Sequence, residues 1–260
     1  MQLQGGENGL RSEKARGVLE GSHRERELEL EPKLSESLRV EDLWVDLADF
    51  SLRADFFVDP GERLVLWGPS GSGKSTLLRV IAGLEIAGTK RSGKISMGPR
   101  DMTLLPPQAR QIGFVFQDQV LFPNLNVLDN AVFGLKMKGM AQEQREAEGR
   151  AWLDRVGLGR RVYTSVDQLS VGERQRVAFI RALIWKPRLI LLDEPFSALD
   201  PAMRSSMRAE LLDLHQLSHA PMILVTHDQT DVEAIAQVQM DLHLGGESRE
   251  RWARRAQSPS

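Results

Sequence analysis

The sequence contains no cysteine, which excludes a disulfide bond, a thiolate metal site, an iron–sulfur cluster and a cysteine nucleophile. No apolar run approaches the roughly 20 residues that a membrane-spanning helix needs, and the N-terminus lacks the apolar core of a signal peptide. Neither charge is in excess, because 34 Lys and Arg residues are balanced by 36 Asp and Glu residues. We therefore expect no binding to nucleic acid, and we expect any contact with a membrane to go through a partner.

The rest of the composition is ordinary for a globular protein, with 260 residues of which 41% are hydrophobic and 27% charged. That length fits one large domain or two small ones. Residues 1–37 carry alternating charges and few large apolar groups, which predicts a disordered or solvated N-terminal extension. Residues 246–260 are predicted to form a C-terminal tail, and we expect a short frayed helix over residues 245–255.

Between these ends the sequence alternates between strand patterns and helix patterns. Residues 50–58 alternate apolar and polar side chains, which predicts a half-buried strand. Short continuous apolar runs predict strands covered on both faces at residues 64–67, 189–192 and 222–225, and residues 112–116 are a further strand candidate. Helical patterns follow at residues 74–82, 172–184, 201–217 and 230–236. This order predicts an α/β doubly wound core, and residues 118–185, which show no comparable strand, are expected to form an inserted helical subdomain.

The loop after the strand at residues 64–67 matches the pattern G-x-x-x-x-G-K-[ST], in the strand–loop–helix context that this motif requires. Glycines allow consecutive backbone N–H groups to turn toward phosphate oxygens, and the helix N-terminus adds positive partial charge. We expect Lys74 to reach the β- and γ-phosphates of a nucleotide and the Ser75 hydroxyl to bind Mg²⁺. The predicted phosphate-binding residues are Gly68, Pro69, Ser70, Gly71, Ser72, Gly73, Lys74, Ser75 and Thr76.

Polar side chains follow three of the predicted strands directly. Asp193 and Glu194 end one strand, and Gln117 and His227 follow two others. Because ligands of open α/β sheets lie beyond the carboxyl ends of the strands, we expect these groups to meet beside the phosphate loop. Asp193 would then bind Mg²⁺ together with Ser75, and Glu194 would polarise an attacking water as a general base. Any one of these side chains alone is more often structural.

Together these motifs resemble the nucleotide-binding subunit of ATP-binding cassette (ABC) transporters, over about residues 38–245. The Walker A loop is residues 68–76, the Walker B strand ends at Asp193, and Gln117 resembles the Q-loop glutamine, a Mg²⁺ ligand. Residues 197–200 resemble the D-loop, and His227 resembles the switch histidine. Residues 169–177 resemble the signature motif, whose Ser170, Gly172 and Glu173 would contact nucleotide.

The resemblance implies a P-loop NTPase fold of ABC type, with a RecA-like parallel-sheet core, an antiparallel β subdomain and an inserted helical subdomain. It implies an ATPase that uses ATP and Mg²⁺, with Glu194, His227, Lys74 and Gln117 as its catalytic residues. In the family the signature binds nucleotide held by a second subunit, so a head-to-tail dimer with two ATP molecules between the subunits is implied. The expected partner in this dimer is a second copy of this chain, and a related but different chain is the alternative.

Two features depart from the family pattern. Val171 and Glu173 stand where the signature usually has glycine and glutamine, and Val171 restricts the backbone where glycine would be free. The aromatic residue that stacks on adenine normally lies upstream of the phosphate loop. Trp44 is near that place, and either a stacking role or a core role fits it.

Residues 114–135 look most like importer ATPases for polyamines, iron, thiamine, sulfate or maltose. This likeness implies transmembrane permease subunits, a solute-binding protein, and a peripheral location at the cytoplasmic face of the cell membrane. The segment after Leu244 is expected to be too short for an added regulatory domain. The alternatives are an ABC exporter or lipid-extracting ATPase, a soluble ABC protein outside transport, and an ATP-binding interaction module without hydrolysis.

Overall fold

The computed structural model describes residues 36–47, 51–86, 88–118, 120–241 and 255–256. Nearly all of the expected N-terminal extension and most of the expected C-terminal tail therefore lie outside the described residues. Arg255 was expected at the end of a short helix, but it belongs to strand β10 (Arg255–Ala256), which pairs antiparallel with strand β9 (Val238–Asp241). The prediction for Arg255 was wrong because the edge of a sheet offers its backbone hydrogen-bond partners that composition does not reveal.

Within the described residues, the central sheet has the strand order β10-β9-β3-β8-β7-β6, and all its pairs except β10–β9 are parallel. Its remaining strands are β3 (Arg63–Trp67), β6 (Ile112–Val115), β7 (Leu189–Asp193) and β8 (Met222–Thr226). Each lies within one residue of a predicted strand. Every residue of β7 and β8 is buried, as the continuous apolar runs indicated.

The two faces of the central sheet belong to two hydrophobic cores. Leu191 of β7 and Ile223 of β8 face one core, whereas their neighbours Leu192 and Leu224 face the other. This follows from the strand period of two, which sends successive side chains to opposite faces. The central sheet thus separates the two cores and contributes side chains to both.

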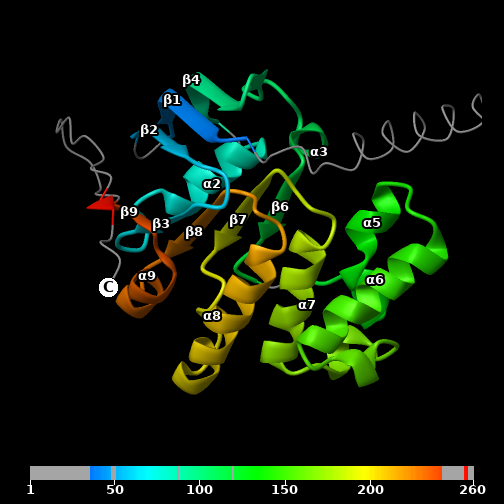
Figure 1. Cartoon of the computed structure of the whole chain (residues 1–260). Coiled ribbons are helices and arrows are strands. Elements are labelled where there is room, and N and C mark those ends of the chain that lie inside the picture. The colour runs from blue at the N-terminus through cyan, green and yellow to red at the C-terminus, as the bar shows by residue number, and fades with distance from the viewer. Residues whose placement is uncertain (1–35, 48–50, 87, 119, 242–254, 257–260) are drawn as a thin grey trace, which may run out of the picture. The chain divides into compact units, whose positions relative to one another are not determined.

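A second sheet is antiparallel and has the order β2-β1-β4-β5 among the described residues. Its strands are β1 (Leu38–Asp46), β2 (Ser51–Val58), β4 (Lys90–Met97) and β5 (Arg100–Asp101). The buried side chains of β1, β2 and β4 join the core that also contains helix α2 (Lys74–Ala82) and one face of the central sheet. Figure 1 shows this sheet above α2, on the side of the central sheet away from helix α8 (Pro201–Gln216).

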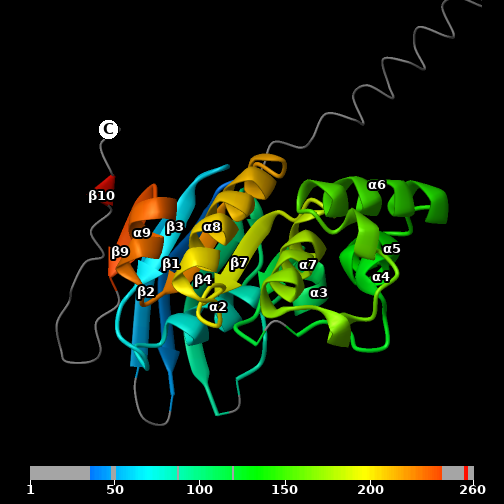
Figure 2. The ribbon, with the colours of Figure 1, turned by 90° about the horizontal axis from the view of Figure 1, so that it is seen from below.

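The segment between β6 and β7 forms the helices that the sequence indicated for residues 118–185. They are α4 (Val127–Ala131), α5 (Phe133–Met137), α6 (Gln142–Arg155), the 3₁₀ turns η1 (Gly159–Arg161) and η2 (Val166–Gln168), and α7 (Val171–Leu183). Since β6 and β7 are adjacent and parallel, this helical segment is an excursion from the sheet that returns beside its starting point. Figures 1 and 2 both place α7 between α8 and the helices α4 to α6.

The remaining helices are α3 (Pro107–Arg110), before β6, and α9 (Gln229–Ile235), after β8. Helices α7, α8 and α9 cover the face of the central sheet opposite α2 (Figure 2). Among the described residues, no helix combines the length and the apolarity needed to span a membrane. The fold confirms the predicted α/β class, with its parallel core, antiparallel sheet and helical segment.

Candidate functional site

The phosphate loop leaves β3 and enters α2, as its sequence pattern requires. Gly71 has a φ of 83° and Gly73, the N-cap of α2, has a φ of 89°. A residue with a Cβ avoids this left-handed region, so glycine at both positions permits the curl of the loop. The first N–H groups of α2 consequently point into the space that the loop encloses.

Lys74 is the first residue of α2, and its side chain curls back over the phosphate loop. Its Nζ donates hydrogen bonds to the carbonyl oxygens of Gly68 at 2.8 Å and of Pro69 at 2.7 Å. Burial lowers the pKa of Lys74, while the carboxylates of Glu194 and Asp193 oppose this shift. The ammonium is therefore buried at the loop's centre, beside two acidic groups.

Ser75 and Asp193 join the phosphate loop to the end of β7. The Ser75 hydroxyl donates a hydrogen bond of 2.7 Å to Oδ1 of Asp193, although the two residues are 118 positions apart. Burial raises the pKa of Asp193, and the neighbouring Glu194 adds to the rise. Among the described residues, no group of three or more His, Cys, Asp or Glu side chains is arranged so that it could hold a metal ion. A hydroxyl and one carboxylate nevertheless fit Mg²⁺, which binds few protein oxygens and completes its shell with water and phosphate.

Glu194 and His227 face each other across two adjacent strands. Glu194 Oε1 lies 3.1 Å from Nδ1 of His227, which follows the end of β8. Glu194 has a φ of 45°, a left-handed conformation that is unfavourable for a residue with a side chain. Three hydrogen bonds stabilise it, since the N–H of Glu194 donates to Val225 O, and the N–H and the hydroxyl of Ser197 both donate to Glu194 O.

Gln117 lies beyond the end of β6 and is exposed. No hydrogen bond joins it to Ser75 or Asp193 in the described part of the chain. It lines an open hollow with the start of α7 and the D-loop segment, formed by Gln117, Asp118, Val171, Arg174, Ser197 and Ala198. The hollow brings together three segments that the sequence singled out separately.

The signature segment begins helix α7 with its own capping residues. Ser170 is the N-cap and accepts a hydrogen bond from the N–H of Glu173, whose carboxylate accepts one from the N–H of Ser170 at 2.9 Å. These bonds form a capping box, in which two of the helix's free N–H groups are satisfied by side chains. Gly172 packs closely against helix α8, since a Cβ at this position would lie 2.5 Å from the sulfur of Met203.

The unusual Glu173 is neutralised within the chain. Arg161 Nη1 lies 2.5 Å from Oε1 of Glu173, and Arg161 also donates to the carbonyl of Gln168. The hydrogen bond from the Ser170 N–H, followed by contacts with Arg161, lowers the pKa of Glu173. The sequence did not reveal Arg161 as a partner, because nothing in its spacing marks the pair.

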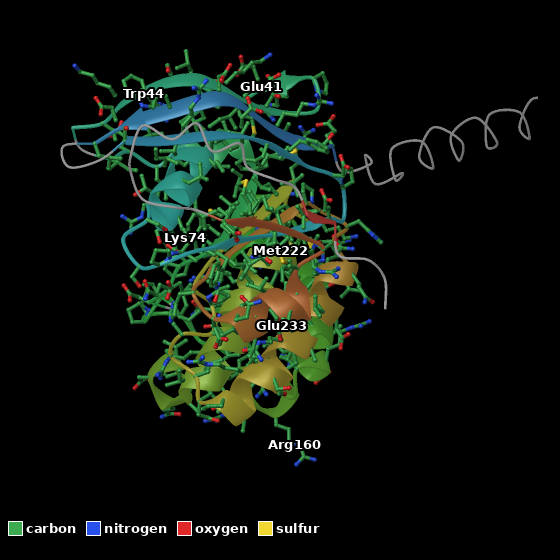
Figure 3. The ribbon with its side chains drawn as sticks, turned by 90° about the vertical axis from the view of Figure 1, so that its left-hand side faces the viewer. Glu41, Trp44, Lys74, Arg160, Met222 and Glu233 are labelled. Carbon is green, nitrogen blue, oxygen red and sulfur yellow. The ribbon has the colours of Figure 1, made fainter. Side chains whose placement is uncertain are left out.

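Trp44 lies in β1, opposite Arg53 of β2 and Ser92 of β4, and its side chain is 46% exposed. Figure 3 shows it on the antiparallel sheet, apart from Lys74 at the start of α2. The structure thus brings Lys74, Ser75, Asp193, Glu194 and His227 together, whereas Trp44 stands apart from that group.

The signature residues Ser170, Gly172 and Glu173 lie at the start of α7. A family model described as "ABC transporter" matches residues 52–197, more than half of the chain. The chain belongs to the ABC transporter family. The match includes the phosphate loop, Gln117, the signature segment, Asp193 and Glu194.

Several named import proteins resemble this ABC chain. The sulfate/thiosulfate import ATP-binding protein CysA of Mycobacterium tuberculosis is 47% identical over 191 residues, which are 74% of this chain and 54% of that protein. The spermidine/putrescine import ATP-binding protein PotA of Bacteroides fragilis is 44% identical over 174 residues, 67% of this chain and 37% of that protein. The Fe(3+) ions import ATP-binding protein FbpC 1 of Rhizobium meliloti is 42% identical over 182 residues, 69% of this chain and 50% of that protein.

These relatives confirm the predicted resemblance to importer-type ABC proteins. The ABC chain spans about half the length of the curated relatives that it matches.

Proposed function

We propose that this chain is the ATP-binding and ATP-hydrolysing subunit of an ABC importer. The observation that supports this proposal most is that the phosphate loop, the Ser75–Asp193 pair and the Glu194–His227 pair lie together at one edge of the central sheet. The names of the relatives, which are import ATP-binding proteins, support the direction of transport.

Each group has a distinct task in this proposal. Residues 68–76 bind the phosphates through backbone N–H groups, and Lys74 exchanges its loop carbonyl partners for β- and γ-phosphate oxygens. Ser75, Asp193 and Gln117 would hold Mg²⁺, which supplies charge neutralisation between the phosphates. Trp44 remains the proposed adenine-stacking residue.

Hydrolysis proceeds by attack of a water oxygen on the γ-phosphorus. Glu194 accepts the proton of that water as the new P–O bond forms, and the bond between the γ-phosphorus and the bridging oxygen breaks to release ADP and phosphate. His227 contacts the Glu194 carboxylate and orients it. The 3.1 Å distance between the two side chains places them in hydrogen-bond range.

The signature provides the second half of the nucleotide site. Ser170, Gly172 and Glu173 lie at the N-terminus of a 13-residue helix, which favours an anion. We propose that they contact ATP bound to a second subunit, a copy of this chain, in a head-to-tail dimer. ATP would close this dimer and hydrolysis would open it, moving permease subunits at the cytoplasmic face of the membrane. A solute-binding protein would complete the importer.

The isosteric substitution Glu194→Gln tests the function directly. It removes the proton acceptor but retains the side-chain volume, so we expect ATP binding to persist while turnover falls by about a hundredfold or more. The variant should also accumulate an ATP-bound dimer, measured by size-exclusion chromatography with multi-angle light scattering.

Glu233→Gln is a matched control, because Glu233 is exposed on α9 and apart from Lys74 (Figure 3). Its turnover should equal that of the unmodified chain. Unchanged turnover in Glu194→Gln would refute the assigned base, and the absence of ATP hydrolysis in the unmodified chain would refute the proposed activity.

A further inference from the structure

Arg204, in the first turn of α8, contacts the segments on both sides of the Glu194–His227 pair. Its Nη1 donates a hydrogen bond of 2.7 Å to Oδ2 of Asp228, the residue that directly follows His227 in the sequence. Its Nε donates to the carbonyl of Leu199 at 2.9 Å and its Nη2 to the carbonyl of Ser197 at 3.4 Å. One guanidinium therefore links the D-loop segment, residues 197–200, to the residue beside His227.

The contacts continue from both ends of this link to the catalytic pair. On one side, the N–H and the hydroxyl of Ser197 both donate to the carbonyl of Glu194. On the other side, Asp228 adjoins His227 in the chain and caps helix α9 by accepting from the N–H of Thr230. The Glu194–His227 contact closes the ring, so Arg204 completes a circuit of neighbouring groups around the pair.

These contacts are relevant to the strained backbone conformation of Glu194. A left-handed backbone at a residue with a side chain persists only where surrounding contacts hold it. Ser197 is one of those contacts, and the carbonyl of Ser197 is in turn fixed by Arg204. A planar guanidinium with several donors can bind two carbonyls and one carboxylate at once, which an ammonium cannot reproduce.

The surroundings of Arg204 support an ion pair with a charged Asp228. Hydrogen bonds from Thr230, and then the Arg204 guanidinium, lower the pKa of the Asp228 carboxyl. Glu194, Phe196, Ser197, Arg204, His227 and Asp228 line one small cavity with Thr226 and Asp231. The link is thus directly adjacent to the reacting groups, although Arg204 does not touch the phosphate loop in the described structure.

We propose that Arg204 is a positioning residue, which holds the Glu194 carboxylate and the His227 imidazole in one geometry by joining the D-loop segment to Asp228. The proposal rests on the proposed ATPase function. It assigns to Arg204 an effect on the chemical step and not on nucleotide binding, because its contacts are with the segments that carry the base and its partner.

Arg188→Ala provides a matched control for Arg204→Ala. Arg188, directly before β7, lies 3.3 Å from Glu36, and these side chains are 27% and 33% exposed, against 25% and 24% for Arg204 and Asp228. Both variants thus remove a similarly buried arginine that pairs with a carboxylate. Arg188 lies at the opposite end of β7 from Asp193, so only the Arg204 pair adjoins the catalytic segments.

We expect Arg204→Ala to lower kcat by about tenfold to a hundredfold, since small misplacements of catalytic groups have effects of that size. Its affinity for ATP should stay within about twofold of the unmodified chain, the pattern of a defect in the chemical step. Arg204→Lys should recover part of kcat, because it retains the charge opposite Asp228 but loses the carbonyl contacts. Arg188→Ala should retain the kcat of the unmodified chain, and thermal melting reports whether each variant is folded.

The imidazole resonance of His227 is a second readout, which requires no turnover. We expect Arg204→Ala to shift this resonance in a ¹H–¹³C spectrum and Arg188→Ala to leave it in place, with the signal assigned by its loss in His227→Ala. A kcat for Arg204→Ala equal to that of Arg188→Ala, or an unmoved His227 resonance, would overturn the positioning role. If the unmodified chain hydrolyses no ATP, the proposed function fails, whereas the resonance still decides whether Arg204 positions His227.

Discussion

The phosphate loop leads into the N-terminus of α2, and the signature segment forms the N-terminus of α7; both helix ends are proposed to bind phosphate, but they are built differently. At α2, glycines with positive φ form the approach, Gly73 caps without a side-chain bond, and the buried Lys74 supplies the charge. At α7, Ser170 and Glu173 form a capping box, and Arg161 neutralises the carboxylate.

This difference fits the separate tasks that the proposed function gives to the two helix ends. The α2 end lies beside the acidic and imidazole groups of its own chain, so binding and chemistry can act on one phosphate group. The α7 end is held in shape by its own side chains, with Ser170 and Val171 exposed. It is therefore suited to a ligand that another molecule presents, which is the role proposed for it.

The largest expected effect is at the α2 end. Lys74→Ala removes the buried ammonium, and the loss of charged hydrogen bonds to phosphate should weaken ATP binding by about a hundredfold or more. Isothermal titration calorimetry with ATP and Mg²⁺ measures the change. Lys136→Ala, at an exposed position of α5, is the control and should bind normally. Normal ATP affinity in Lys74→Ala would remove the assignment of the phosphate loop.

A smaller effect is expected at the α7 end. Arg161→Ala leaves the Glu173 carboxylate without its cation beside an anion-binding helix N-terminus, so ATP-dependent dimerisation should weaken by about tenfold. Adding Glu173→Gln to this variant removes the charge and should restore dimerisation. ATP binding to the monomer should stay unchanged in both variants. A double variant as weak as Arg161→Ala would show that Arg161 acts by other means than charge.

The smallest expected effects come from the two helix-start glycines. Gly73→Ala forces a Cβ into the left-handed region and should destabilise the chain by about 1–2 kcal/mol. Gly172→Ala meets only the flexible end of Met203, which can move, so its cost should be below about 1 kcal/mol. Urea unfolding monitored by circular dichroism compares them. The reverse order would show that Met203 is fixed, and that the α7 end is the more rigid of the two.

The central sheet was predictable because its strands are continuous apolar runs buried on both faces. The antiparallel sheet was predicted only in part, for residues 50–58. Strand β1 changes register in the region of Asp42, and β4 begins with five exposed residues. Neither strand shows the sustained alternation that marks a half-buried strand.

The residues of the candidate site likewise include some that the sequence predicted and some that it did not. Lys74, Ser75, Asp193, Glu194 and His227 follow strands that end at one edge, so their meeting was predicted from chain order alone and agrees with the contacts described above. The partners Arg204 and Arg161 were not predicted. Their contacts depend on how α8 and η1 pack against distant loops, and arginines on helix surfaces have no spacing that reveals such partners.

The left-handed backbone at Glu194 carries a consequence for how such a protein would evolve. In the proposed function, hydrolysis requires at this position a side chain that the local backbone disfavours. A lineage released from selection for hydrolysis would gain folding stability by accepting glycine there, because glycine adopts the same conformation without strain. Loss of enzymatic turnover and increased thermal resistance would then arise in a single mutational step.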